Sequence, residues 1–355
     1  MTCPRRLKER GSVEDAAISR SAGVKGLTRN YYILSSGRLK REQNTVYFEN
    51  VNVKKAIPIN DIYAIYVYGE LDLNTKLLDF LTQNKVPIHF FNYYGFYSGS
   101  YYPREYLHSG FLIVKQVEHY IDGEKRLRIA KEIIRSASYN ILRNLFYYRK
   151  RGRRINEYIS EIENLRKEIG NAKLISELMS IEGRIRNQYY RSFNEILREG
   201  FQLLKRVKRP PDNMVNCLIS FGNSLLYATT LSEIYNTQLN PTISYLHEPG
   251  ERRFSLSLDL SEIFKPLIID RTIFTLINNR IIKPRHFLQE LNYCYLKENG
   301  KKIFIKEYDE RLKTTIMHKT LKRKVSYQRL IRLECYKLIK HLIGEKTYEG
   351  LKAWW

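Results

Sequence analysis

A stripe of apolar residues near the middle of the chain contains one carboxylate, Glu182. The other members of the stripe recur at the three- and four-residue spacing of a helix face: Leu174, Leu178, Ile185, Tyr189 and Ile196. A carboxylate at such a position is costly unless a cation or a metal ion balances its charge. Glu182 is therefore either a metal ligand or one half of an ion pair, with Arg186 or with an arginine elsewhere in the chain.

A second group of polar residues follows further along the chain. Asp259 and Glu262 are three residues apart, so on a helix their carboxylates project from one face and repel each other. A divalent cation or a nearby arginine is the usual reason for keeping two such carboxylates together. His247 precedes them in a loop punctuated by Pro249 and Gly250, which could bring its imidazole toward that face. Each residue also has an ordinary structural explanation, and spacing does not show that Glu182 meets the other two.

These residues belong to a longer series of motifs. In chain order the series comprises Glu182-Gly183, Arg184, Tyr190, Arg209-Pro210-Pro211-Asp212, Asn216, Ser220, Leu225-Leu226-Tyr227, Leu246-His247, the run from Asp259 to Pro266, and Asp270-Arg271. The series resembles the CRISPR-associated spacer-acquisition integrase family in matching order. Asn74 to Leu81 and Gly95 to Gly99 resemble the N-terminal domain of that family, so the resemblance covers about residues 28–355.

The resemblance implies a metal site and a reaction. The ligands and catalytic residues would be Glu182, His247 and Glu262, holding Mg²⁺ or Mn²⁺, with Asp259 as an auxiliary acid one turn earlier. Such a site keeps positions open for water and phosphate, so it suits DNA cleavage and strand transfer by 3′-hydroxyl ends into a CRISPR array. The mixed ligand set argues against calcium storage and against a closed structural zinc site. Lys265 stands where many members have arginine, which keeps the charge but loses the fork geometry for phosphate.

Composition favours a nucleic-acid partner independently of the resemblance. Lys and Arg number 61 against 37 Asp and Glu, a net charge of +24 that calls for a polyanionic partner. Basic runs that could contact phosphates occur at Arg143, Arg149 to Arg154, Lys205 to Arg209 and Lys319 to Lys324. The individual DNA-binding candidates are Arg184, Tyr190, Arg209, Arg252, Arg253, Lys265 and Arg285. Taken singly, each basic run favours a solvated face over a phosphate contact, and together the runs account for the charge.

The resemblance also implies partners and a setting. It predicts double-stranded DNA as substrate, both as spacer precursor and as CRISPR repeat and leader. It further predicts a homodimer, a small partner protein of the adaptation complex, and a cytoplasmic location in a prokaryote. Two other readings remain open: a non-catalytic nucleic-acid-binding scaffold whose acids are ion-paired with arginines, and a nuclease acting on RNA or on branched DNA.

The elements that must position these residues indicate an α+β protein. Residues 29–103 predict a small β-rich domain, with strands at Tyr31 to Leu34, Thr45 to Phe48, Ile62 to Tyr68 and Ile88 to Asn92. The resemblance implies that this domain serves dimerisation. Asn74 would cap one short helix in that domain. Residues 104–355 predict a larger, mostly α-helical catalytic domain. Its helices are expected at about 125–149, 155–169, 172–199, 213–236, 254–278 and 326–344, with a strand at Lys301 to Ile305 after Asn299-Gly300.

The remaining features concern the chain's ends and its surroundings. Residues 1–28 are basic and without periodicity, which predicts a flexible tail or a misassigned start. The four cysteines, Cys3, Cys217, Cys294 and Cys335, are too far apart for a zinc motif and are interpreted as structural thiols. No run of about 18 uncharged apolar residues occurs, so no membrane association is expected.

Overall fold

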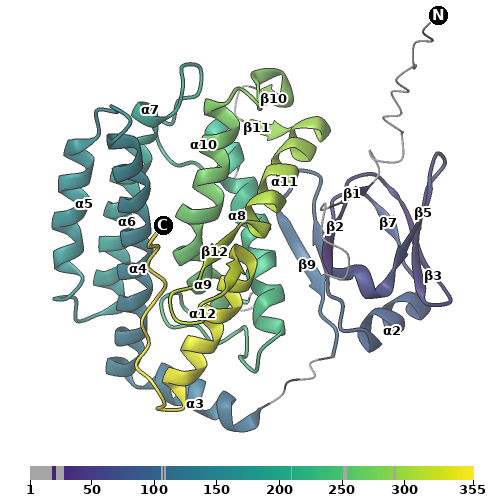
Figure 1. The fold of residues 1–355 in the computed structure, drawn as a ribbon, viewed down its shortest axis with the longest axis horizontal. Helices are drawn as coiled ribbons and strands as arrows, with labels where there is room; N and C mark the ends of the chain where they lie inside the picture. Colours follow the sequence, from purple (N-terminus) through teal and green to yellow (C-terminus); the bar gives the residue numbers. More distant parts are fainter. Residues whose placement is uncertain are drawn as a thin grey trace, which may run out of the picture. The chain divides into compact units, whose positions relative to one another are not determined.

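The computed structural model describes residues 28–104, 107, 109–208, 210–250, 254–290 and 293–355, and the backbone of residues 18–20. The chain divides into two compact units, Met1–Arg104 and Glu105–Trp355. The first unit is rich in strands and the second is mostly helical (Figure 1), which confirms the predicted α+β class.

The first unit contains two sheets and one α-helix in its described residues. The strands are β1 (Ile18–Arg20), β2 (Arg29–Ile33), β3 (Gly37–Glu42), β4 (Thr45–Glu49), β5 (Lys54–Pro58), β6 (Ile62–Val67), β7 (Leu71–Asp72), β8 (Ile88–Phe91) and β9 (Tyr97–Tyr101). A 3-10 turn, η1 (Ile59–Asp61), precedes β6, and helix α2 spans Thr75–Gln83. One sheet has the order β1-β2-β6-β8-β9 and the other has the order β5-β4-β3-β7.

The core of this unit follows from alternation along its strands. On β2 and β6, Ile33, Ile65 and Val67 are buried in one apolar cluster, against which α2 packs Leu77 and Leu81. Asn74 caps α2 as expected, because its side-chain oxygen accepts a 3.0 Å hydrogen bond from the Leu77 N–H. The four strands predicted at 31–34, 45–48, 62–68 and 88–92 correspond to β2, β4, β6 and β8.

Strands β3 and β5 were not predicted, because charged residues interrupt their apolar pattern. On β3 only Leu39 is fully buried, while Lys40 forms a 2.8 Å ion pair with Glu49 on the neighbouring β4. Cross-strand pairs of opposite charge stabilise a sheet without an apolar signal in the sequence. Within residues 1–28, expected as a tail, Ile18–Arg20 pair with β2 as a strand, and residues 1–17 and 21–27 lie outside the described residues.

The second unit is built mainly from helices. The α-helices are α3 (Gly110–Ile121), α4 (Gly123–Arg149), α5 (Asn156–Glu168), α6 (Ile175–Arg191), α7 (Phe193–Ile196), α8 (Met214–Tyr235), α9 (Ser255–Lys265), α10 (Arg271–Asn278), α11 (Glu298–Lys313) and α12 (Tyr327–Leu342). A π-helical segment, η2 (Pro266–Asp270), joins α9 to α10, and a 3-10 turn, η3 (Pro284–His286), follows α10. Two small hairpins pair β10 (Phe287–Glu290) with β11 (Tyr293–Leu296) and β12 (Thr315–Met317) with β13 (Lys324–Ser326).

Helix α8 lies at the centre of this unit and is buried on nearly every side. Helix α9 packs against α8 on one side and α4 on the other, so it is enclosed as well. Helices α4, α5 and α6 pack against one another and stand side by side in Figure 1. The two helices that carry the predicted acidic residues, α6 and α9, therefore both contact α4.

Two predictions about local structure change. The strand expected at Lys301 to Ile305 is wrong, because those residues belong to helix α11. Gly300 lies in the first turn of that helix, where an added Cβ would stand 2.6 Å from the His286 carbonyl oxygen. The helix expected over 172–199 is divided into α6 and α7 at Ser192.

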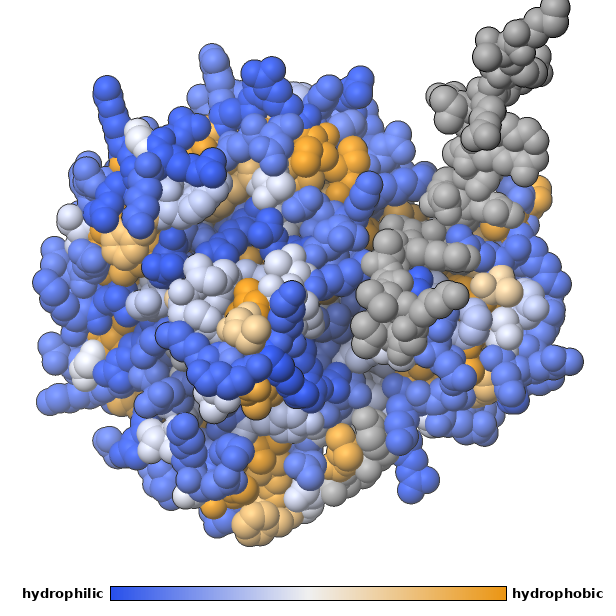
Figure 2. Space-filling view, viewed as in Figure 1, coloured by the Kyte–Doolittle hydropathy of each residue, from blue (hydrophilic) through white to orange (hydrophobic). Residues whose placement is uncertain are grey.

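The surface of the second unit and the cysteine residues bear on the compositional expectations. On the face of the second unit seen in Figure 2, hydrophobic residues form small groups among hydrophilic ones. Among the described helices, none has the length and apolar character needed to cross a membrane. Cys217, Cys294 and Cys335 are buried free thiols, as predicted, and Cys3 lies outside the described residues.

Candidate metal centre

Glu182 lies on α6 and forms the ion pair that was one of its two possible roles. Its Oε1 accepts a 3.0 Å hydrogen bond from Nε of Arg186, one turn further along the helix. Arg186 is 8% exposed, whereas the Glu182 side chain is 21% exposed. Glu182 is thus at the edge of the core, and its neighbour Arg186 carries a buried positive charge.

Arg186 also joins α6 to α9. Its Nη2 donates to Oε2 of Glu262, a residue 76 positions away in the sequence, while Nζ of Lys265 donates to the other oxygen of Glu262. The Nε and Nη2 groups occupy one edge of the guanidinium, so the Glu182 and Glu262 carboxylates lie next to each other along that edge. Two of the three predicted ligands are therefore neighbours in the folded chain.

The electrostatics of Glu262 favour its charged form. Burial by itself would raise the pKa of Glu262, but the positive charges of Lys265 and Arg186 outweigh burial and lower it to about 2. Glu262 is 6% exposed, so these charges act with little screening by water. The residue is a carboxylate at any physiological pH.

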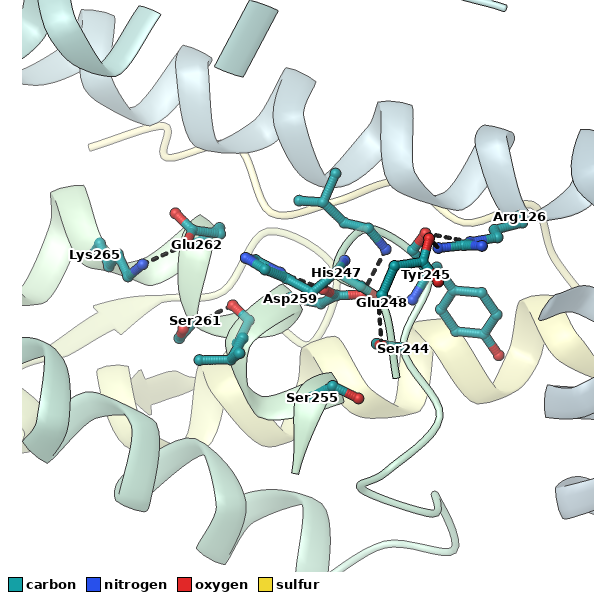
Figure 3. A network of polar contacts seen from close by, with 12 residues as sticks. Arg126, Ser244, Tyr245, His247, Glu248, Ser255, Asp259, Ser261, Glu262 and Lys265 are labelled. Carbon is teal, nitrogen blue, oxygen red and sulfur yellow. Dashed lines mark hydrogen bonds and ion pairs between the residues drawn. The ribbon is translucent and has the colours of Figure 1, made fainter. Parts of the chain in front are cut away.

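His247 lies beside Asp259, and the pair is shown in Figure 3. Nδ1 of His247 and Oδ1 of Asp259 are 2.8 Å apart, and because a carboxylate only accepts hydrogen bonds, Nδ1 carries the proton. In the neutral ring, Nε2 of His247 is then the nitrogen with the lone pair, and no hydrogen bond to it occurs within the described part of the chain. This is the arrangement in which a carboxylate orients a metal-binding histidine through its second nitrogen.

Both carboxylate oxygens of Asp259 are occupied by hydrogen bonds from the protein, so neither is available to bind a metal ion. Its Oδ2 accepts hydrogen bonds of 2.7 Å and 2.9 Å from the backbone N–H groups of Tyr245 and Leu246. Its Oδ1 accepts a further 3.0 Å bond from the backbone N–H of His247. The side chain is completely buried, so Asp259 shapes the 245–247 loop and fixes the imidazole rather than facing solvent.

The pKa of His247 depends on both acidic residues of α9, Asp259 and Glu262. Burial by itself would lower the pKa of His247, but the hydrogen bond and charge of Asp259 and the charge of Glu262 raise it above its ordinary value. The negative charge of Glu262 therefore favours the protonated form of His247, whereas the positive charge of Lys265 lowers the pKa of His247 and opposes this effect. Glu262 is thus linked to Glu182 on α6 through Arg186, and its charge acts on His247 in the 245–247 loop.

The donor set suits a hard divalent cation, although the ligands are engaged by cations of the protein. Two carboxylates and one imidazole nitrogen are the atoms that Mg²⁺ and Mn²⁺ accept. Arg186 and Lys265 hold the Glu262 oxygens, and Arg186 holds Glu182. Among the described residues, no three His, Cys, Asp or Glu side chains are arranged to hold a metal ion together. The chemistry of the donors fits a metal, and in this structure Arg186 and Lys265 occupy the carboxylate oxygens.

The backbone between Ile263 and Pro266 is held from the side by α4. Pro266 has no N–H, so the helical hydrogen-bond ladder is interrupted where η2 begins. Asn140 donates a 3.0 Å hydrogen bond to the carbonyl of Ile263, and Asn144 donates a 2.8 Å bond to the carbonyl of Pro266. These two asparagines were not among the predicted site residues, although polar residues four apart on an apolar helix face are a detectable signal.

Asp270 ends the π-helical segment and lies close to Arg186. It is 2% exposed, and its Oδ2 lacks a hydrogen-bond partner in the described structure. Burial raises the pKa of Asp270 to about 7, against the opposing pull of Arg186. Nη1 of Arg186 is likewise buried and has no partner among the described residues. A carboxyl and a guanidinium that act on each other electrostatically therefore each have one buried polar atom without a partner among the described residues.

The predicted DNA-binding residues occupy different environments. Arg184 is exposed and pairs with Glu168 on α5, while Lys265 pairs with Glu262 inside the site. Tyr190 lies against Arg186 and Arg206, and burial raises its pKa to about 12. Arg285 is exposed beside a pocket of about 360 Å³ that His286 and Lys297 also line. Arg209, Arg252 and Arg253 lie outside the described residues.

Arg206, from the predicted basic run 205–209, has a structural role in this region. Its guanidinium donates to Oδ1 of Asn216 at 3.0 Å and to Oγ of Ser220 at 2.8 Å, both on α8. Asn216 and Ser220 are two of the motif residues that had no assigned role. Both residues hold Arg206 beside Tyr190. A structural contact therefore accounts for the presence of Asn216 and Ser220 in the motif series.

Comparisons with known proteins agree on one family. The model of the family described as CRISPR associated protein Cas1 matches residues 31–310. A relative named CRISPR-associated endonuclease Cas1 3, from Thermodesulfovibrio yellowstonii, is 54% identical over 331 residues, which are 92% of this chain and 100% of the relative.

Solved structures show the same fold. A Cas1 protein from Thermotoga maritima is 45% identical, with a TM-score of 0.82 over 90% of this chain and 98% of that one. A casposase bound to an integration product has a TM-score of 0.78 at 19% identity, over 92% of this chain and 94% of that one. The second likeness concerns the fold alone.

Proposed function

The chain belongs to the family of the CRISPR-associated protein Cas1, and on that premise we propose that it is a Mg²⁺- or Mn²⁺-dependent DNA endonuclease and integrase. In this proposal it inserts short DNA fragments into a CRISPR array, by transesterification in which the 3′-hydroxyl ends of the fragment attack the array. The endonuclease part is supported by the name of a relative that is 54% identical. The strand-transfer part is supported by the site's chemistry and by its resemblance to the integrase family.

The observation that supports the proposal most is that Glu262 is linked to both other predicted ligands, to Glu182 through Arg186 and to His247 through its charge. Glu182 and Glu262 share the guanidinium of Arg186, and the charge of Glu262 acts on His247. A scaffold protein has no need for a histidine whose proton is fixed on Nδ1 by a buried carboxylate and whose Nε2 is left to accept. We therefore assign these three side chains as the metal ligands.

Each residue has a definite task in this assignment. A divalent cation held here would polarise a phosphoryl group and stabilise the departing 3′ oxygen. Glu182 and Glu262 supply carboxylate oxygens, and His247 supplies Nε2 because Asp259 keeps the proton on Nδ1. Asp259 is a positioning residue, since all its contacts are to the 245–247 loop.

The substrate and partners follow from charge and family. The net charge of +24 supports double-stranded DNA as the substrate, as spacer precursor and as array. We further propose a homodimer, dimerising through the first unit, that works with a small partner protein of the same adaptation complex. A two-fold assembly suits a reaction that joins both ends of one fragment. The cytoplasm of a prokaryote is the corresponding location.

An integration assay tests the proposal. Purified protein, supercoiled plasmid and a short duplex with 3′-hydroxyl ends are incubated with Mn²⁺, and relaxed or branched products are separated on a gel. Chelator and His247→Ala are each expected to abolish joining and cleavage. The matched control is His119→Ala, because His119 on α3 contacts its own helix and His341 rather than the site. Joining by the chelated enzyme or by His247→Ala would show that the ligand assignment is wrong.

One specific observation favours a second candidate, a non-catalytic DNA-binding scaffold. Arg186 neutralises Glu182 and Glu262, which is what such a protein requires of its buried acids. A scaffold binds DNA equally with and without chelator and joins none of it. The same assay, run beside a DNA-binding measurement on Glu182→Ala, separates the two candidates. Replacing the duplex by RNA or branched DNA tests the remaining substrate classes.

A further inference from the structure

The charges around Arg186 are arranged for an exchange of partners. The guanidinium has acidic neighbours on two sides: Glu182 and Glu262 on the edge formed by Nε and Nη2, and Asp270 among the charges that act on it. Its Nη1 is buried without a partner among the described residues, and so is Oδ2 of Asp270. Buried polar atoms of this kind are costly, and their persistence calls for a reason.

We propose that Arg186 is an internal counter-ion that holds Glu182 and Glu262 in the metal-free protein and moves to Asp270 when a divalent cation binds. This inference rests on the proposed metal site and adds a role for two residues outside the ligand set. Arg186 and Asp270 are positioning residues in this account, because they act on the ligands and not on the substrate.

The physical reason is electrostatic repulsion. Without a cation, the neighbouring carboxylates of Glu182 and Glu262 would repel each other at the edge of an apolar core. Arg186 removes that repulsion by bonding to both. A metal ion placed between the same oxygens brings a second positive charge to the same place, so the guanidinium is then the group that is repelled.

Asp270 is suited to receive the displaced guanidinium. It lies on η2, five residues beyond Lys265, and is a buried carboxyl whose charge acts on Arg186. A guanidinium that turns toward Asp270 would satisfy Nη1 and Oδ2 together and keep the buried positive charge paired. Lys265, the other cation on Glu262, is 18% exposed at its side chain and can move outward into solvent.

The test is Mn²⁺ binding, measured in the absence of DNA by electron paramagnetic resonance of the free ion. If Arg186 competes with the metal, Arg186→Gln binds Mn²⁺ about tenfold more tightly than the wild type. Equal or weaker binding overturns the inference. Should Arg186→Gln fail to fold, Arg186→Lys replaces it, because an ammonium cannot bond both carboxylates as the fork does. Its expected affinity lies between those of the wild type and the glutamine variant, and an affinity no higher than wild type overturns the inference.

Asp270→Asn tests the second half. Without an anionic acceptor for the guanidinium, this variant is expected to bind Mn²⁺ several-fold more weakly than the wild type. In the Arg186→Gln background the same change is expected to have no effect on Mn²⁺ affinity, since no guanidinium remains to be received. Equal effects in both backgrounds would contradict the role of Asp270.

Two controls separate this inference from the proposed function. Arg184→Gln removes an exposed arginine of the same helix that pairs with Glu168, and it is expected to leave Mn²⁺ affinity unchanged. Glu182→Gln is expected to abolish saturable binding. If the wild type itself shows no Glu182-dependent Mn²⁺ binding, the proposed function fails. If the wild type binds and Arg186→Gln gains nothing, only the role of Arg186 fails.

Discussion

His247 and Asp259 form a pair in which every hydrogen bond of the carboxylate within the described part of the chain goes to one short loop. Four donors converge on Asp259: the imidazole Nδ1 and the backbone N–H groups of Tyr245, Leu246 and His247. One buried side chain therefore fixes the path of the loop and the orientation of the ring at its end. The loop has no regular secondary structure of its own, so this carboxylate replaces the ladder that a helix or strand would supply.

Replacing the carboxylate of Asp259 is expected to affect both activity and stability. Asp259→Asn leaves one acceptor oxygen for four donors and turns an N–H₂ group toward them, so the loop loosens and the His247 proton is no longer fixed on Nδ1. Loss of such an orienting partner lowers metal affinity or activity by about 10- to 100-fold. The measurement is Mn²⁺ affinity together with the rate of strand joining. The control is Asp122→Asn, an exposed cap of α4, which should keep both.

The interrupted helix beyond Glu262 depends on α4. Asn144→Leu removes the donor to the Pro266 carbonyl and to the Tyr189 hydroxyl, leaving buried acceptors without partners. The expected loss in free energy of unfolding is about 1–3 kcal/mol. Urea unfolding measures it, and Asn164→Leu serves as control because Asn164 is exposed on α5 and bonds only a lysine of its own helix. A loss of equal size in both variants would contradict the stated role.

Two helix glycines offer a test of close packing. In α8, a Cβ on Gly222 would stand 2.7 Å from Cγ2 of Ile269 on η2 and 2.9 Å from the Phe304 ring, so Gly222→Ala forces the two elements apart. The expected cost is about 1–3 kcal/mol in free energy of unfolding. In α6, nothing lies within 4 Å of a Cβ on Gly183, and Gly183→Ala is expected to stabilise by about 0.5–1 kcal/mol. Thermal unfolding of both variants measures the opposite signs.

The stability of the first unit is expected to fall in acid because of His89 on β8. Burial lowers the pKa of His89 to about 3, so the folded unit holds it neutral. In the unfolded chain the residue takes up a proton near its ordinary pKa of about 6.5. The contribution of the neutral His89 ring to the free energy of unfolding is therefore complete above pH 6.5. This contribution is lost progressively as the pH falls toward 3. Between pH 7 and pH 4.5 the loss amounts to about 2–3 kcal/mol.

Hydrogen exchange of peptides from β8, measured at both pH values, follows this loss within the first unit. His89→Gln is compared for its pH dependence rather than for its absolute stability, and its acid-induced loss is expected to be smaller by that amount. His119→Gln, in the second unit, should show the wild-type pH dependence in β8. An unchanged pH dependence in His89→Gln would assign the acid sensitivity to other groups.

Local patterns predicted the elements of both units well where the apolar periodicity is clean. Strands β2, β4, β6 and β8 and the cap at Asn74 follow from alternation and capping. The failures come from competing signals. Leu39 is the only fully buried residue of the charged strand β3, and Asn299-Gly300 imitates a hairpin turn although it opens a helix. In both places, contacts with distant residues override the local pattern.

The sequence by itself predicted the candidate residues Glu182, His247 and Glu262 and the helices that carry the two acids, because residue type and periodicity are local properties. It could not decide between a ligand and an ion pair for Glu182, since that depends on Arg186 reaching Glu262 across 76 positions of chain. Only the packing of α6 and α9 on a shared neighbour, α4, brings those charges together. The energy of a buried charge is set by what surrounds it in space, so tertiary structure alone assigns Arg186 its two acids and Asp259 its loop.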